Sequence, residues 1–274
     1  MNARLRYIVR PTYRFCKIML QLNVIKTLYI NFRKLPFLQA IHIPIYVYGH
    51  LKIDSLKGRI IINHPIKTGM IKIGYDIDAA PLASLKSRLI IRGVLIFNGF
   101  VLIGKGSVVA VEGEMVIGNC CTIGSGCLMK SMTNISIGDN CCITYGCTIF
   151  DSNMHYVKNI ETGIVKKNRA PIIIGKSCWV NAGTIIAKGV VLPDYSITAR
   201  NSYLCKDYSS FGNNLFLVGS PAKILNVKIQ RIFSSKEQNR LGNYFKENPN
   251  ADHILLDAGL FKETSDETWF RWVI

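Results

Sequence analysis

Residues 174–204 read IGKSCW VNAGTI IAKGVV LPDYSI TARNSY L, and a six-residue pattern runs through the whole stretch. Every sixth position holds an aliphatic residue or threonine: Ile174, Val180, Ile186, Leu192, Thr198 and Leu204. Four positions after each of the first five comes a small or β-branched residue: Cys178, Thr184, Val190, Ser196 and Ser202. A period of six is too long for a helical turn and is typical of a parallel β-helix.

The same frame continues upstream, so the predicted β-helix covers much of the chain. It appears at Ile91, Phe97, Ile103, Ile117, Ile123, Ile137 and Ile143. Each hexad supplies a short strand whose aliphatic residue points inward, and three hexads make one coil stacked ~4.8 Å from the next. Phe97, Ile117 and Ile137 are 20 residues apart, two more than three hexads. We therefore expect a bulge at one corner of these coils.

The chain has nine cysteines, and five of them occupy the small position of the hexad: Cys121, Cys127, Cys141, Cys147 and Cys178. At that position a free cysteine packs as a compact hydrophobe. The cysteine clusters lack the Cys-x-x-Cys spacing of a zinc site, so we predict no metal, and a zinc or thiol-nucleophile role stays a minor alternative. An odd number of cysteines is ordinary in a reducing compartment.

The two ends of the chain lack the hexads and have helical spacing. Residues 1–47 are predicted to be a basic helical segment with a helix that ends near Leu35-Pro36. Residues 48–225 form the predicted β-helix domain, with irregular first coils. Residues 226–274 are predicted to hold a helix that begins at Ser234, followed by a tail to which we assign no role.

The chain is strongly basic, with 34 Lys and Arg against 17 Asp and Glu and a formal net charge of +17. Eleven basic residues and one acidic residue lie in the first 60 positions. Residues 1–35 are thus either an amphipathic helix with a solvated basic face or a peripheral contact with an anionic membrane. No uninterrupted apolar signal segment is present, so we expect a cytoplasmic protein, held at the inner face of the membrane in the second case. Charge alone is weak support for nucleic-acid binding, which we do not predict.

The six-residue pattern has one long interruption, between Ile149 and Pro171, where the chain reads IFDSNMHYVKNIETGIVKKNRAP. A regular coil cannot contain this interval, so part of it must leave the body as a loop, and loops on rigid scaffolds often have functional roles. His155, within it, is the only histidine in the region of the hexads. It is therefore the candidate catalytic residue.

Several ordered motifs give this chain a resemblance to hexapeptide-repeat O-acetyltransferases, above all the bacterial sugar and surface-polysaccharide enzymes. The motifs are DSNMH at 151–155, a basic loop with Thr162-Gly163, PIIIGKSCWVNAG at 171–183 and VGSPAK at 218–223. The resemblance covers roughly residues 90–225. It implies an all-β fold, the left-handed parallel β-helix, and it is the source of the handedness.

The resemblance also implies a reaction, in which acetyl-CoA is the donor and a sugar hydroxyl is the acceptor. His155 matches the family's catalytic histidine and would act as the general base. Asn153 and Asp151 are the nearest polar candidates to orient His155. A backbone N–H near Asn181 or Ala182 would stabilise the thioester oxyanion.

Donor-binding residues follow from the resemblance by position. Trp179 matches a tryptophan beside the thioester, and Ala182 and Arg200 match positions whose backbone meets the pantetheine arm. Lys206 and Lys223 match cations near the nucleotide phosphates, a task that suits flexible point charges. The competing interpretations are packing between subunits for Trp179 and an ordinary solvated surface for the two lysines. The family is typically a homotrimer with sites between subunits, so loop 156–170 is expected to reach a neighbour.

The sequence departs from the family in two places. The family's Tyr and Asn for the acceptor are absent from CTIGS at 121–125, so the acceptor sugar is not predicted. Its usual Gly-Ala-Gly before the phosphate-side lysine is replaced by Ala199-Arg200-Asn201. Two other classes share such coils. A zinc carbonic anhydrase needs three histidines, and a non-enzymatic scaffold would not explain the excursion around His155.

Overall fold

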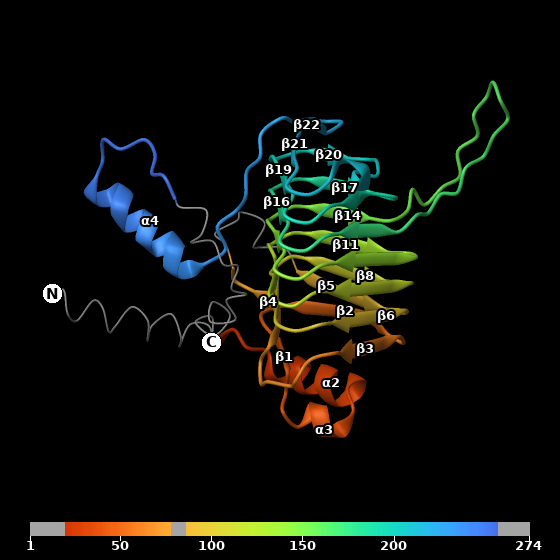
Figure 1. The fold of residues 1–274 in the computed structure, drawn as a ribbon. Coiled ribbons are helices and arrows are strands. Elements are labelled where there is room, and N and C mark those ends of the chain that lie inside the picture. The colour runs from red at the N-terminus through yellow and green to blue at the C-terminus, as the bar shows by residue number, and fades with distance from the viewer. Residues whose placement is uncertain (1–19, 78–85, 257–274) are drawn as a thin grey trace, which may run out of the picture.

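The computed structural model describes residues 20–77 and 86–256, and these form a three-sided column of parallel strands with two helices at one end and a longer helix beside it (Figure 1). Within this part of the chain the strands build three sheets. The first sheet contains β1 (Ile45–Val47), β4 (Ile71–Tyr75), β7 (Val101–Gly104), β10 (Cys121–Ile123), β13 (Cys142–Ile143), β16 (Trp179–Val180), β19 (Ile197–Thr198), β21 (Phe216–Val218) and β22 (Lys223–Leu225).

The other two sheets follow the same stacking order along the column. The second contains β2 (Leu51–Leu56), β5 (Ser87–Ile91), β8 (Val108–Val111), β11 (Leu128–Ser131), β14 (Thr148–Phe150), β17 (Ile185–Ala187) and β20 (Tyr203–Leu204). The third contains β3 (Arg59–Ile62), β6 (Val94–Phe97), β9 (Glu114–Ile117), β12 (Asn134–Ile137), β15 (Ile172–Ile174) and β18 (Val191–Leu192). The chain visits the sheets in turn, and all pairings between these strands are parallel except β21 with β22. The predicted fold class, the left-handed parallel β-helix, is confirmed.

The hexads set the core, because the residue at every sixth position points into the column. Ile174, Val180, Ile186, Leu192 and Leu204 are all buried, and the strands stack these positions directly on one another. The frame at Phe97 is also confirmed, since Phe97 pairs with Ile62 below and Ile117 above and is fully buried.

The two extra residues of the 20-residue coils lie at the corner between the second and third sheets, as the expected bulges. Gly93 and Gly113 form this corner in successive coils, and Gly93 lies directly against the backbone carbonyl of Gly113. A Cβ at Gly93 would lie 1.8 Å from that oxygen, so the close stacking of these corners requires glycine.

The five small-position cysteines are buried, and each thiol contacts the next coil. The Sγ atoms of Cys121, Cys127, Cys141, Cys147 and Cys178 lie 3.0–3.2 Å from the carbonyl oxygens of Gly138, Thr144, Gly175, Asn181 and Pro193, respectively. Hydroxyls at equivalent corners do the same, as Ser107 Oγ donates to the Gly124 carbonyl at 3.0 Å. The packing interpretation of these cysteines therefore agrees with the structure, and each thiol adds a weak hydrogen bond between coils.

Helices cover the first coil and follow the last one. Helix α2 (Val24–Lys34) ends at Leu35, before Pro36, as predicted, and α3 (Phe37–Ala40) follows it. Strand β1 starts at Ile45, so the coils begin inside the segment 1–47. The first coils are irregular, as expected, with register shifts between Ile53 and Ser55 and between Ile73 and Tyr75. After the short helix η2 (Ser209–Phe211) and β22, helix α4 (Ser235–Glu247) has the predicted cap, with the Ser234 hydroxyl accepting from the Glu237 N–H at 3.3 Å. Residues 1–19 and 257–274 lie outside the described part. No described helix is long and apolar enough to cross a membrane.

Candidate active site

The excursion between β14 and β15 leaves the column at the corner between the second and third sheets, and its root is held by hydrogen bonds. Ser152 and Arg169 form an antiparallel bridge. The Asn153 N–H donates to the Asn168 carbonyl at 2.8 Å, and the Asn168 side-chain amide donates to the Met154 carbonyl at 3.2 Å. The segment just before His155 is therefore held to the returning segment of the excursion.

Beyond the root, the excursion is a two-stranded arm that projects away from the column (Figure 1). Lys158 and Val165 pair across it, and the Asn159 N–H donates to the Ile164 carbonyl at 2.9 Å. The Asn159 side chain accepts from the Thr162 N–H at 2.8 Å and closes the tip. The predicted loop is thus a structured arm. Its apolar residues Tyr156, Val157, Ile160, Ile164 and Val165 are exposed.

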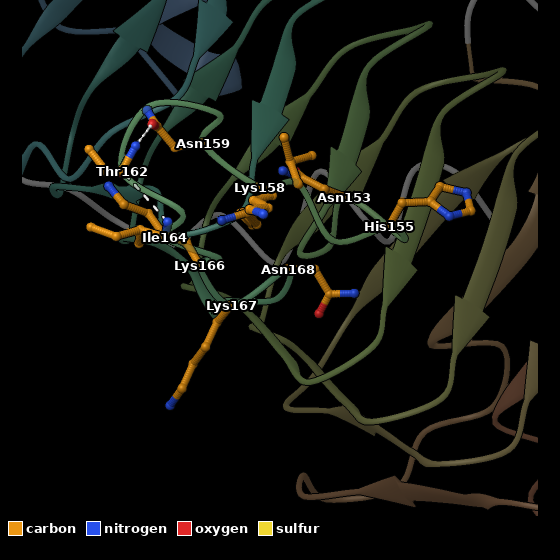
Figure 2. A pocket seen from close by; sticks show the side chains of 11 residues that line it. Asn153, His155, Lys158, Asn159, Thr162, Ile164, Lys166, Lys167 and Asn168 are labelled. Atoms are coloured by element: carbon orange, nitrogen blue, oxygen red, sulfur yellow. Dashed lines mark hydrogen bonds between the residues drawn. The ribbon is translucent and has the colours of Figure 1, made fainter.

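His155 lies at the base of the arm, and its side chain is exposed. The backbone N–H of His155 donates to the Asn153 carbonyl at 2.7 Å. It borders a cavity of about 550 Å³. The cavity is lined by Asn153, His155, Val157, Lys158, Asn159, Thr162, Ile164, Lys166, Lys167, Asn168 and Lys188. None of these residues is acidic, so four lysines give the cavity a positive potential. In Figure 2 the His155 ring and the Lys167 side chain point in different directions.

Asp151 does not orient His155, and this expectation was wrong. Its carboxylate is fully buried and accepts hydrogen bonds from the N–H groups of Met132, Thr133 and Asn134 at 2.7, 2.7 and 2.9 Å. The Thr133 hydroxyl donates to it as well, at 2.8 Å. Asp151 therefore caps the corner of the coil below. Asn153 lines the cavity beside His155, and its orienting role stays a prediction.

Lys188 is a site residue that the sequence analysis missed. It follows β17 at the corner one coil above the root of the arm, where the Gly189 N–H approaches the carbonyls of Ala170 and Pro171 at 3.3 and 3.1 Å. The stacking of these corners brings Lys188 to the cavity across more than 30 positions of sequence. The only signal in the sequence is its place in the hexad after Ile186.

Trp179 lies on the outer side of the first sheet and is covered by the segment that precedes α4. The Arg231 guanidinium lies 5.2 Å from the Trp179 ring and 4.9 Å from the Phe233 ring. Trp179 pairs with Cys142 in the neighbouring strand, and burial raises the pKa of the Cys142 thiol. Trp179 thus packs against Arg231 of its own chain, while its place beside the thioester and the alternative of packing between subunits stay predictions.

Ala182 and Arg200 lie one above the other at the corner between the first and second sheets. The Asn201 N–H donates to the Ala182 carbonyl at 2.9 Å, and the Arg200 guanidinium donates to the Tyr145 hydroxyl at 2.7 Å. The N–H of Asn181 already donates to the Thr198 hydroxyl at 3.0 Å. Asn181 is therefore unsuited as an oxyanion donor, which leaves Ala182.

Lys206 and Lys223 are exposed near the last coil, on either side of the buried Tyr208. The Lys206 ammonium lies 5.4 Å from the Tyr208 ring and 5.5 Å from the Phe211 ring. The Tyr208 hydroxyl donates to the carbonyl of Ala222, the residue before Lys223, at 3.4 Å. Both ammonium groups are therefore accessible to an anionic ligand at this end of the column.

The predicted site residues divide between two edges of the column. His155, Lys188 and Lys206 lie where the second sheet passes to the third, whereas Ala182 and Arg200 lie where the first passes to the second. A single chain does not bring His155 together with Ala182 and Arg200. Within residues 20–77 and 86–256, no three His, Cys, Asp or Glu side chains gather into a metal site.

Comparison with known proteins finds similarity in fold. No family model and no curated protein matches the sequence. Among solved structures, the polySia-specific acetyltransferase NeuO is 20% identical with a TM-score of 0.46, covering 76% of this chain and 95% of its own. The polysialic acid O-acetyltransferase OatWY is 20% identical with a TM-score of 0.37, covering 72% and 100%.

A third solved structure is VCA0836 from Vibrio cholerae O1 biovar eltor, a hexapeptide-repeat-containing acetyltransferase complexed with acetyl coenzyme A. It is 21% identical with a TM-score of 0.35, covering 42% of this chain and 61% of its own. These structural neighbours are hexapeptide-repeat acetyltransferases. At such identities and TM-scores they assign neither residues nor a substrate to this chain.

Proposed function

We propose that this protein transfers the acetyl group of acetyl-CoA to a sugar hydroxyl of an acidic bacterial cell-surface polysaccharide or its precursor. The observation that supports this most is the position of His155, an exposed imidazole at the base of the arm and beside a cavity with four lysines. A scaffold protein has no need of an accessible base held in place beside a cationic cavity.

In the proposed reaction His155 is the general base. Its unprotonated ring nitrogen takes the proton of the sugar hydroxyl while the oxygen attacks the thioester carbon. The tetrahedral oxyanion accepts a hydrogen bond from the Ala182 N–H. The C–S bond then breaks, the imidazolium returns its proton to the thiolate, and CoA and the acetyl ester leave without a covalent enzyme intermediate.

The donor is proposed to lie along the outer edges of the upper coils. Ala182 and the Arg200 backbone border the pantetheine arm, and Trp179 lies next to the thioester end. Lys206 and Lys223 bind the nucleotide phosphates as flexible cations. Acetyl-CoA is bound in the solved VCA0836 structure, which agrees with this choice of donor.

An acidic acceptor suits the charge of the cavity. Lys158, Lys166, Lys167 and Lys188 line it and no acidic residue does, so a polyanionic glycan would be attracted and a neutral one would not. NeuO and OatWY are described as acting on polysialic acid, an acidic polymer. We use that polymer as the first probe.

The division of the residues between two edges supports a homotrimer with composite sites. In a three-fold assembly of parallel columns, the edge with His155 of one subunit faces the edge with Ala182 and Arg200 of the next. The exposed apolar residues of the arm, such as Tyr156 and Ile160, would then pack on the neighbour. Each site would contain His155 and Lys206 of one chain and Ala182 and Arg200 of another.

Titration calorimetry with acetyl-CoA, followed by transfer to polysialic acid with release of the CoA thiol as the readout, tests this function. We expect saturable binding that Lys206→Ala weakens and His155→Ala retains, and transfer that His155→Ala abolishes. The absence of binding by folded wild-type protein would contradict the acetyl donor and favour another acyl donor or the scaffold. Binding without transfer to any sugar would contradict the acceptor.

A further inference from the structure

Helix α2 buries Thr27 and Asn31 together with Ile30 and exposes its other apolar side chains, unlike an ordinary surface helix, which buries an apolar stripe. Thr27 and Asn31 are buried against β1, the open edge of the first coil. The Asn31 side chain donates to the Ile45 carbonyl at 2.7 Å and accepts from the Ile45 N–H at 3.1 Å. The Thr27 hydroxyl accepts from the Val47 N–H at 3.0 Å. The polar side chains of α2 therefore form hydrogen bonds with backbone groups of β1 that would otherwise be unpaired, since no coil lies below this strand.

The opposite side of α2, together with α3, presents an apolar surface at the base of the column. It consists of nine side chains that are 41% to 86% exposed: Leu20, Val24, Ile25, Leu28, Tyr29, Phe32, Phe37, Leu38 and Ile41. The rings of Phe32 and Phe37 lie 6.4 Å apart and join the two helices into one surface, which we call the basal face. Figure 1 shows α2 and α3 below β1 and β3, at the end of the column opposite to β22. Contiguous apolar surfaces of this kind mark interaction sites.

The helices of the basal face carry basic side chains and no acidic ones. No acidic residue occurs between positions 20 and 50, while Lys26, Arg33 and Lys34 lie on α2. The Lys34 ammonium donates to the Gly58 carbonyl at 2.6 Å and the Lys26 ammonium to the Leu51 carbonyl, so both charges are held at the rim of the face. Exposed leucine, isoleucine and phenylalanine side chains beside basic ones suit an anionic lipid surface.

We propose that the basal face docks on an anionic phospholipid membrane, with Ile25, Phe37 and Leu38 inserted among the headgroups. The column then stands on the membrane with α2 and α3 lowest and its first coil directly above them. The corner that bears His155 follows β14, four coils above β1 and β2 in the strand order, which at ~4.8 Å per coil is roughly 19 Å. In the proposed trimer the three basal faces lie in one plane and bind together.

The height of His155 above the membrane restricts the class of acceptor, and this inference rests on the proposed function. Because α2 and α3 lie between the first coil and the membrane, and a helix with its side chains is about 10 Å across, a sugar presented to His155 must stand roughly 29 Å above the membrane surface. A saccharide chain linked to a membrane lipid reaches that height after several sugar units, whereas a short lipid-linked monosaccharide does not. We therefore assign the acceptor as a lipid-linked oligosaccharide or polysaccharide.

Cosedimentation with phosphatidylcholine vesicles, with and without phosphatidylglycerol, tests the docking on the full chain. We expect binding to the anionic vesicles, reduced at least about tenfold in the triple variant Ile25→Glu/Phe37→Glu/Leu38→Glu. The matched control is Val227→Glu/Ile229→Glu/Leu255→Glu, which makes the same charge change at exposed apolar residues near the other helical segment. Circular dichroism checks folding, and the milder Ile25→Ser/Leu38→Ser replaces the triple variant if that one fails to fold.

Three results would overturn the docking. The first is wild-type protein that does not bind anionic vesicles, and the second is equal vesicle binding by the triple variant and the control variant. The third is light scattering in which wild-type assemblies pair end to end and the triple variant does not. Transfer to a soluble polysialic acid oligomer is measured in parallel. Because that assay contains no membrane, a wild-type protein that transfers no acetyl group would contradict the proposed function and would say nothing about docking. A triple variant that still transfers acetyl groups shows that its active site is intact, so a loss of vesicle binding in that variant reports on docking.

Discussion

The buried carboxylate of Asp151 accepts both the N–H and the hydroxyl of Thr133, at 2.7 and 2.8 Å. Thr133 stands at the corner of the coil below, so this contact joins the start of the arm to the preceding coil. The adjacent N–H groups of Met132 and Asn134 donate to the same carboxylate. The position of His155 thus depends on the Asp151 carboxylate, four residues earlier in the chain, which does not line the cavity.

We expect Asp151→Asn to lower the free energy of unfolding by about 2–4 kcal/mol, because the amide replaces an acceptor among several donors and leaves buried N–H groups unpaired. Urea denaturation followed by circular dichroism measures this loss. Asp139→Asn is the comparison, since Asp139 makes a single bond of this kind, to the Asn119 N–H at 2.7 Å. Equal losses in the two variants would contradict the capping role.

His155→Ala should reduce the rate of acetyl transfer by roughly 10²–10⁴-fold, the usual contribution of a general base. The side chain is exposed, so we expect no change in the free energy of unfolding and little change in the affinity for acetyl-CoA. Steady-state kinetics and calorimetry together check this. His253→Ala, at another exposed histidine, is the control. A His155→Ala enzyme with normal kcat would remove His155 from the mechanism.

Coexpression of two inactive variants tests whether sites are shared between subunits. His155→Ala alters one edge of the column, and Arg200→Glu/Lys223→Glu alters exposed cations of the donor side. If each site takes one edge from each of two neighbours, random mixing restores about a quarter of the wild-type sites. Mixtures made after purification, without subunit exchange, serve as the control. Failure of the coexpressed pair to regain activity would indicate sites within single chains.

The thiols should differ sharply in reactivity. Cys205 is exposed, whereas burial raises the pKa of the Cys121 thiol well above its usual range and so disfavours the reactive thiolate. In a Cys16→Ser background, which removes the cysteine outside the described residues, we expect one fast-reacting thiol per chain in the native state. Cys205→Ser should abolish the fast phase, and unfolding should release the rest. A fast phase that survives Cys205→Ser would show that the coils open readily.

Cys141→Ser should cost less stability than Cys141→Leu. Serine occurs at the same corner position as Ser196 and can donate to the Gly175 carbonyl as the thiol does. Leucine adds volume to a fully packed corner, which typically costs 1–3 kcal/mol. Urea midpoints of the two variants compare these costs, and a more damaging serine would contradict the packing role of the thiol.

The sequence by itself determined the fold, the core and the place of the excursion. Because a period of six specifies which residue of each strand points inward, positions such as Ile174 and Ile186 could be assigned without the structure. The corner role of Cys141 and Cys178 followed from the same period, and the break after Ile149 located His155. These properties are local and repeat along the chain, so they can be predicted from spacing.

Only the tertiary structure decided which corners stack and what each polar group contacts. It paired Asp151 with Thr133 rather than His155, brought Lys188 to the cavity, and separated Ala182 and Arg200 from the histidine. It also turned the polar face of α2 inward, because Asn31 and Thr27 meet unpaired backbone groups of β1. Coils place residues about 18 or more positions apart in contact, and a backbone edge attracts polar side chains wherever it is left open, so neither effect can be predicted from the local pattern.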